Sequence, residues 1–420
     1  MNGPDAPRPT TAGERIAVLD ALRGFALFGI LFVNTTWFTG YAVLSPEQRQ
    51  ALGTEGIDGV VSWLIQFLVN NKFWSLFALL FGIGAAVQYD RAKARGDAFE
   101  RLFARRVAVL LFIGLLHAVF IWFGDVISLY AVAGFAIILF RRWSDRAILI
   151  CATVCLAAPI VQGGVWLAID QMVRDPSAAR IDPGYGPREL LVYFGSGTYA
   201  EAFKANWAFL TERWYLAIYE GRFFKLLGMF LLGFWAGRKG VLHNAQQTRL
   251  LKRALFWGLL LGVPANAILV KLAGDVALRP PSAAGWLVSS LAAVGVPALC
   301  LAYAAGFALL CHSPIGRRCT AIFVHAGRMT LTNYIVQSII GVTIFYGYGF
   351  GLWGRIGTAW SLGVIGLIFG LQAAWSAWWL RVFRYGPLEW VWRCLTYGQR
   401  LRLRRDQASL PAGARGSIQT

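Results

Sequence analysis

The chain has 420 residues, of which 57% are hydrophobic and 15% aromatic, and this composition excludes an ordinary soluble domain. The formal net charge of +19 does not indicate a nucleic-acid-binding protein, because the basic residues lie in short clusters between apolar stretches. We therefore predict an all-α, polytopic membrane bundle with about ten transmembrane helices and additional interfacial helices.

The first half of the chain predicts a short tail followed by a helical bundle. Residues 1–14 are rich in Pro, Thr and Ala and are expected to be disordered. Residues 15–172 form the expected N-terminal transmembrane bundle, because long apolar stretches recur there between short polar breaks. Its five spans are expected over 17–38, 73–89, 104–123, the stretch from a Gly124-Asp125 turn to Phe140, and 147–168.

A long polar segment, residues 173–221, separates the two halves. Apolar residues recur in it at helical spacing from Phe203 to Ile218, which indicates an amphipathic helix on the outer surface or a lid over a site. A C-terminal transmembrane bundle is expected over 222–398, followed by a basic cytoplasmic tail over 399–420. The five spans of this bundle are expected over 223–237, 254–272, 285–310, 321–346 and 357–380.

The distribution of basic residues predicts the orientation. If the N-terminus is cytoplasmic, most of the 40 Lys and Arg residues fall in the cytoplasmic loops and tails, as the positive-inside rule requires. Both termini are therefore expected inside. The sequence contains no Walker loop, dinucleotide-binding glycine pattern or zinc-ligand spacing in a credible context, so no metal is expected.

The first span carries a polar stripe within an otherwise apolar helix. Asp20, Arg23 and Asn34 fall on one helical face, and ionisable groups inside a span usually face a protein interior or a wet cavity. An Asp20–Arg23 pair at headgroup level that sets orientation is the alternative. Asn34 argues against it, because this residue repeats the polar face near the far end of the helix.

The third span predicts a candidate base. His117 shares a face with Arg106 and lies about 16 Å deeper along the helix, given a rise of 1.5 Å per residue. A neutral imidazole is well suited to accept a proton, although a histidine on an apolar helix is often only a packing residue. Asp125, at the following turn, is expected either to orient the imidazole or simply to cap the next helix.

The ninth span adds further polar candidates. Arg328 lies at its cytoplasmic part and is suited to bind phosphate through its paired donors. Asn333 and Gln337 share a face, and with Tyr334 they are candidate substrate-binding residues. Hydrogen bonding between neighbouring helices is the alternative role of the two amides.

Five stretches of the sequence, in order, resemble one bacterial family, the YeiB-type membrane proteins. The resemblance rests on LDALRGFALFGILFVN, LFALLFGIGAAVQ, LLFIGLLHAVFIWFGDVISLYAVAG, GRMTLTNYIVQSIIG and GPLEWVWRCLTYG, and it covers nearly the whole chain. The first span also resembles the wider transmembrane acyltransferases, including the heparan glucosaminide N-acetyltransferase type. The glycan O-acetylating members have a histidine eleven positions after the first-span arginine, whereas this chain has Asn34 there.

The resemblance implies an acyltransferase of the bacterial plasma (inner) membrane. Acetyl-CoA or another acyl-CoA is expected to enter from the cytoplasm, and a glycan, lipid or small-molecule acceptor of the cell envelope from the outer side. By analogy with the heparan-type enzymes, Asn34 is expected to stabilise an oxyanion, and we place the base at His117. Arg23, Arg106 and Arg328 are expected to bind the CoA phosphates, and Asp20 is expected to orient Arg23 in this cofactor site.

Two other functions fit the same polar groups. A transporter or lipid flippase would use them as a substrate site at mid-membrane, and a non-catalytic membrane protein would use them to bind a partner. A homodimer is compatible with the sequence, and no nucleic-acid partner is expected.

Overall fold

The computed structural model describes residues 16–96, 98–173, 192–242, 244–275 and 282–405, and this part of the chain is helical. The only β-type pairing in these ranges is an isolated bridge between Phe383 and Arg404. The all-α fold class predicted from the sequence is confirmed. The tail predicted over residues 1–14 lies outside the described residues, as does most of the tail predicted over 399–420.

The described chain contains seven helices long and apolar enough to cross a membrane, so the protein is a multi-pass membrane protein. These are α1 (Ala17–Phe38), α4 (Lys72–Arg95, continued from α3 and η3), α5 (Phe99–Phe120), α7 (Asp145–Val173), α11 (Thr248–Asp275), α12 (Ala283–His312) and α15 (Thr358–Val382). The shorter helices are η2 (Tyr41–Val43), α2 (Pro46–Ala51), α3 (Glu55–Leu64), η3 (Ile65–Val69), α6 (Ile127–Phe140), α8 (Val192–Ser196), α9 (Tyr199–Tyr219), α10 (Arg222–Arg238), η5 (Ala245–Gln247), α13 (Pro314–Arg328), α14 (Thr330–Phe345) and α16 (Pro387–Tyr397).

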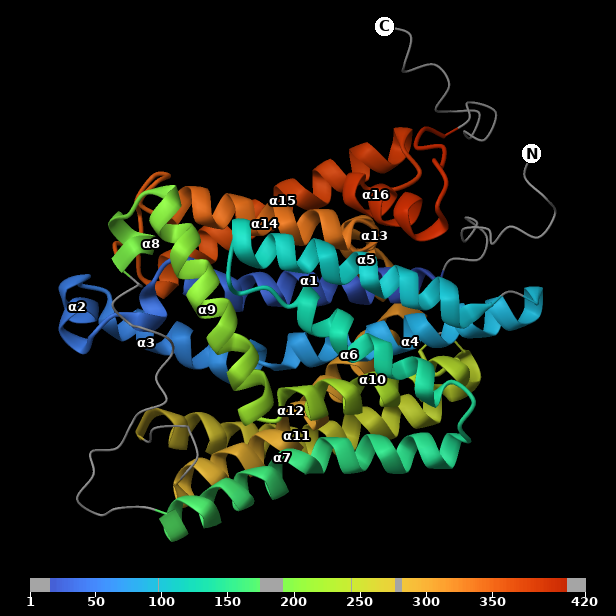
Figure 1. The fold of residues 1–420 in the computed structure, drawn as a ribbon, viewed down its shortest axis with the longest axis horizontal. Helices are drawn as coiled ribbons and strands as arrows, with labels where there is room; N and C mark the ends of the chain where they lie inside the picture. Colours follow the sequence, from blue (N-terminus) through green and yellow to red (C-terminus); the bar gives the residue numbers. More distant parts are fainter. Residues whose placement is uncertain (1–15, 97, 174–191, 243, 276–281, 406–420) are drawn as a thin grey trace, which may run out of the picture.

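The long helices run side by side along the long axis of the molecule (Figure 1). Helix α1 is central and packs against α4, α13, α14 and α15, while α10 lies between α4 and α7. The start of α1 and the end of α16 lie at the same end of the bundle (Figure 1), as expected for a chain with both termini on the cytoplasmic side. We call this the inner end.

Glycine allows α1 and α13 to approach unusually closely. A Cβ atom added to Gly24 would lie 2.0 Å from the carbonyl oxygen of Phe323, and one added to Gly327 would lie 1.8 Å from that of Asp20. Small residues permit such backbone contact between membrane helices. The contact holds the end of α13, and with it Arg328, beside Asp20.

The ninth predicted span is wrong as a single helix. Residues 321–346 are interrupted at Met329, whose φ of −118° and ψ of 35° are not helical, so α13 ends at Arg328 and α14 begins at Thr330. The carboxylate of Glu389 in α16 accepts hydrogen bonds from the N–H groups of Leu331 (2.7 Å) and Thr332 (3.1 Å). A residue distant in the sequence therefore caps α14 and stabilises the helix break at Met329, where the sequence has no proline.

Helix α9 begins at a capping box in which Thr198 and Glu201 exchange hydrogen bonds. It crosses obliquely over the outer end of α5 (Figure 1), where Asn206 Oδ1 accepts from the Phe123 N–H at 3.1 Å. The apolar stripe predicted from the sequence is divided, since Trp207 and Ile218 are 59% and 62% exposed whereas Leu210 is buried and Trp214 packs against the core. The inward face also carries Asn206 and Phe209, so α9 covers the outer end of α5.

Candidate functional site

A cavity of about 300 Å³, which we call the central cavity, lies among α1, α4, α5, α14 and α16. At its inner end it is lined by six arginines, Arg23, Arg91, Arg106, Arg328, Arg384 and Arg393. At its deep end it is lined by Ile30, Val126, Ile127, Tyr130 and Tyr334. The cavity thus runs from a basic mouth towards the turn that joins α5 to α6.

The inner mouth has a strong excess of positive charge. Asp20 and Glu389 are the acidic residues among those that line it, and Asp20 Oδ1 accepts a hydrogen bond from the Arg23 guanidinium at 3.0 Å. Arg106 stacks on the ring of Trp392 at 3.8 Å, which fixes the direction of its guanidinium. Guanidinium groups held this way favour phosphate, because their fork geometry matches phosphate oxygens. The structure therefore brings together the three arginines predicted to bind the CoA phosphates and the aspartate predicted to orient Arg23.

The Glu389 carboxylate is occupied by hydrogen bonds within the protein. Its carboxylate is buried and accepts from the Thr332 hydroxyl at 2.6 Å in addition to the two N–H groups of α14. Burial raises the pKa of Glu389, whereas the hydrogen bonds from Thr332 and Leu331 oppose that shift. This residue shapes the mouth by fixing the start of α14. No local sequence pattern indicates this role, because its partners lie 57 and 58 positions away.

His117 and Asp125 are in direct contact. His117 Nδ1 and Asp125 Oδ1 are 3.0 Å apart, and both side chains are buried. The carboxylate also accepts from the N–H groups of Ile127 (3.1 Å) and Ser128 (2.7 Å). Asp125 therefore has both roles that the sequence left open, since it caps the start of α6 and orients the imidazole.

This arrangement leaves His117 Nε2 available as a base. A carboxylate can only accept, so it favours the tautomer with the proton on Nδ1 and a lone pair on Nε2. Nε2 has no hydrogen-bond partner among the described residues, although the side chain is only 1% exposed. A buried polar atom without a partner is costly, and a reacting ligand group would relieve that cost.

Tyr334 lies beside both His117 and the central cavity. Its side chain lines the deep end, and its ring centroid is 5.2 Å from that of the imidazole. Its hydroxyl accepts from the Val126 N–H at 3.3 Å and lies 3.5 Å from the Gly124 carbonyl, which ties it to the turn carrying Asp125. His117 does not line the cavity itself, so the imidazole is not in direct contact with the cavity.

Asn34 lies just beyond the deep end of the cavity. It is one helical turn after Ile30, which lines the cavity, and one turn before Phe38, whose ring packs against Trp122 at 4.4 Å. Its side chain is 6% exposed, and its Nδ2 has no partner in the described part of the chain. Asn34 thus has a free donor near the α5–α6 turn, although it makes no hydrogen bond to His117.

Asn333 and Gln337 lie outside the site predicted for them. Asn333 Nδ2 donates to Ser376 Oγ at 3.0 Å, and Gln337 Nε2 donates to Gln372 Oε1 at 2.8 Å. Both amides therefore face α15, and neither lines the central cavity. The alternative role in helix–helix hydrogen bonding accounts for them, because amides inside a membrane bundle need such partners.

Arg213 is a site candidate that the sequence reasoning missed. It lies two turns after Asn206 on the inward face of α9 and makes no hydrogen bond or ion pair with the described residues. Burial lowers the pKa of Arg213, and the charges of nearby Asp125, Tyr334 and Tyr130 oppose that shift. The sequence signal for this site was the seven-residue spacing of Asn206 and Arg213, which places both on one face of a helix.

Comparisons with known proteins connect the chain with proteins of undetermined activity. Residues 236–399 match a family described as a protein of unknown function, DUF418. Uncharacterized protein YxaH of Bacillus subtilis is 31% identical, over 93% of this chain and 96% of its own length. An uncharacterized 39.9 kDa protein from the amylase 3′ region of Bacillus acidopullulyticus is 29% identical over the same shares. Uncharacterized protein YeiB of Escherichia coli is 28% identical over 91% of this chain and 96% of its own.

Proposed function

This chain belongs to the YeiB-like family of multi-pass membrane proteins, and on that premise we propose that it is an acyltransferase. It takes an acyl group, in the first instance acetyl, from cytoplasmic acyl-CoA and delivers it to an acceptor at the outer side of the bacterial plasma membrane. The observation that carries the proposal is the central cavity, which leads from six arginines to the wall formed by Tyr334 beside His117 and Asp125.

The charged phosphates and the long pantetheine arm of the acyl-CoA donor bind to different parts of the central cavity. Phosphates of acyl-CoA meet Arg23, Arg106 and Arg328 at the inner mouth, and Asp20 holds Arg23 in place. The pantetheine arm then extends along the cavity, whose deeper wall is apolar and aromatic. A rotation of the Tyr334 ring brings the thioester within reach of His117, because this ring lines the deep end of the cavity and packs against the imidazole.

The chemistry follows from the free Nε2 of His117. It takes a proton from an acceptor hydroxyl or amine as that group attacks the thioester carbonyl. The resulting oxyanion accepts a hydrogen bond from Asn34, and Asp125 stabilises the imidazolium. Collapse of the tetrahedral intermediate breaks the carbon–sulfur bond, and the imidazolium returns its proton to the departing CoA thiolate. The products are the acylated acceptor and free CoA.

The acceptor is a sugar or lipid of the cell envelope that approaches from the outer side, past α9. Asn206 and Arg213 of α9 face the outer end of α5, where the turn carrying Asp125 lies. No metal takes part in the proposed reaction, since the proton transfers need only His117 and the charge stabilisation only neighbouring side chains.

A transporter or flippase is the second candidate, and the break at Met329 favours it. Interrupted helices beside a polar cavity are typical of transporter substrate sites. Uptake or flipping by the purified protein in liposomes that contain no acyl-CoA would support this alternative.

The experiment that tests acyl transfer uses the full chain in membranes supplied with labelled acetyl-CoA. We expect His117→Ala to lower labelling of protein or acceptor by about 10²- to 10⁴-fold, the usual contribution of a general base. His312→Ala is the matched control, because this histidine lies at the inner end of α12 and does not line the central cavity. Unchanged labelling in His117→Ala would remove this residue from the mechanism.

A further inference from the structure

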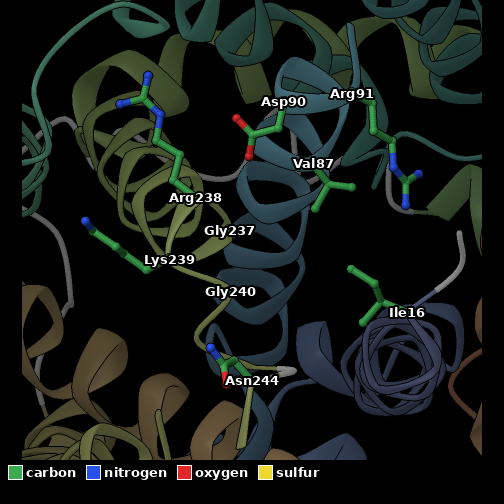
Figure 2. Close-up of a pocket in the computed structure, with 9 residues that line it drawn as sticks. All are labelled: Ile16, Val87, Asp90, Arg91, Gly237, Arg238, Lys239, Gly240 and Asn244. Carbon is green, nitrogen blue, oxygen red and sulfur yellow. The ribbon is translucent and has the colours of Figure 1, made fainter. Parts of the chain in front are cut away.

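A second and more open cavity, of about 600 Å³, lies at the inner end of the bundle between α4 and α10. We call it the inner basin, and the nine residues that line it are Ile16, Val87, Asp90, Arg91, Gly237, Arg238, Lys239, Gly240 and Asn244. Figure 2 shows Arg238 and Lys239 on one side of it and Arg91 and Ile16 on the other. Of these nine residues, Arg91 is also one of the six arginines at the mouth of the central cavity.

The inner basin adjoins the central cavity. Ile16, Val87 and Arg91 line both of them, and Val87 and Arg91 are one helical turn apart on α4. A ligand long enough to pass over this shared edge occupies both cavities at once. Arg91 is then placed at the middle of such a ligand.

The central cavity is too small for the whole donor. Its 300 Å³ lies at the lower limit of the roughly 300–1,000 Å³ typical of pockets that hold drug-sized ligands. Acyl-CoA is longer than a drug-sized ligand, since it consists of a nucleotide with a 3′-phosphate joined through a diphosphate to the pantetheine arm. The central cavity therefore accommodates one end of the donor, and the other end needs a second space.

The inner basin offers suitable groups for a nucleotide phosphate. Arg238 is held rigidly, because its guanidinium donates to the carbonyls of Trp143 (2.8 Å) and Arg141 and stacks on Phe234 at 4.7 Å. Lys239 is 50% exposed and pairs with Asp145 at 2.7 Å, so its ammonium has further donors for a second anion. Three cations thus line the basin together with the carboxylate of Asp90, and Asp145 beside the basin pairs with both Arg238 (3.6 Å) and Lys239.

The basin also offers groups for the uncharged part of a nucleotide. Gly240 presents no side chain, so a flat ring can approach the backbone there, whereas Gly237 is buried against Ile83 and Ala86 of α4. Asn244 Oδ1 already accepts from the Gln246 N–H at 2.9 Å, and its Nδ2 remains a donor that suits a ring-nitrogen acceptor of adenine.

From this juxtaposition we propose that the inner basin binds the adenosine 3′-phosphate end of acyl-CoA while the central cavity holds its pantetheine arm. The proposal rests on the function proposed above and adds a second subsite to it. Lys239 and Arg238 bind the 3′-phosphate, and Arg91, at the edge shared by the two cavities, binds the diphosphate together with the arginines at the inner mouth.

The test compares a complete donor with a truncated one, using the full chain in lipid nanodiscs. The variant is Lys239→Glu, which reverses a charge on a half-exposed side chain and is expected to fold. We expect its KM for acetyl-CoA to rise about tenfold or more, which corresponds to about 1.4 kcal/mol, while its KM for acetyl-pantetheine is unchanged. Direct binding of adenosine 3′,5′-bisphosphate, measured by calorimetry, is expected to weaken by the same factor.

Arg384→Gln is the comparison variant, because Arg384 lines the mouth of the central cavity and not the inner basin. Weaker binding of the bisphosphate in Arg384→Gln, with unchanged binding in Lys239→Glu, would place the nucleotide at the mouth and overturn the proposal. Wild-type protein that binds neither acetyl-CoA nor the bisphosphate would overturn the proposed function itself.

Discussion

Replacing Asp125 by asparagine tests whether the buried carboxylate acts through His117 or only supports the fold. The substitution keeps the size of the side chain but removes its charge and replaces one acceptor oxygen by an NH₂ donor. Asp125 makes one contact to the imidazole and accepts from two N–H groups of α6, so an amide cannot satisfy all three partners.

The expected effect on stability is moderate. Hydrogen bonds to charged groups contribute about 1.5–3 kcal/mol each, and asparagine keeps some of the bonds that the carboxylate makes. We therefore expect the free energy of unfolding to fall by about 2 kcal/mol. The expected effect on activity is much larger, a fall in kcat of about 10²- to 10⁴-fold, because the imidazole loses its orientation and its counter-charge.

The chain offers a matched control in Asp58. This carboxylate is also fully buried and caps a helix, since it accepts from the Ala359 N–H at 2.7 Å and from the Thr54 hydroxyl at 2.6 Å. It does not line the central cavity. Asp58→Asn should cost similar stability and leave acyl transfer unchanged.

The assay is acetyl transfer from labelled acetyl-CoA by protein in nanodiscs, with thermal unfolding measured on the same samples. A loss of kcat at constant KM for the donor, in Asp125→Asn alone, is the signature of a residue that acts on the base. If both variants lose stability equally and both keep full activity, Asp125 is only a helix cap and the role assigned to His117 loses its main support.

Two further predictions concern residues that lie around the site. Glu389→Ala should lower the free energy of unfolding by about 2 kcal/mol, because it removes the cap of α14 and leaves two buried N–H groups unsatisfied. Thermal unfolding of this variant is compared with that of Glu47→Ala, which changes an exposed residue. Equal unfolding temperatures of the two variants would contradict the prediction. Arg213→Gln should leave stability unchanged or raise it, because it removes a partly buried and unpaired charge, while acyl transfer falls about tenfold. A variant of Arg213 that loses stability and keeps its activity would show a purely structural role.

The sequence by itself determined the class of the protein and most of its helices. A helix satisfies its own backbone hydrogen bonds inside lipid, so a long apolar stretch has few alternatives, and the predicted spans at 17–38, 285–310 and 357–380 correspond closely to α1, α12 and α15. On the apolar stretches that became α1 and α5, Asp20, Arg23, Arg106 and His117 were predicted as site candidates, because such residues are costly in a membrane unless they face a cavity.

The tertiary structure alone decided which of those residues meet. The turn after α5 folds Asp125 back onto His117, although they are eight residues apart. Packing of α14 against α15 turns Asn333 and Gln337 away from the cavity, and Glu389 maintains a helix break more than fifty residues distant. Hydropathy and periodicity report only on neighbours along the chain. Contacts between helices depend on close backbone approach and on shared hydrogen bonds, which arise only when the whole bundle is assembled.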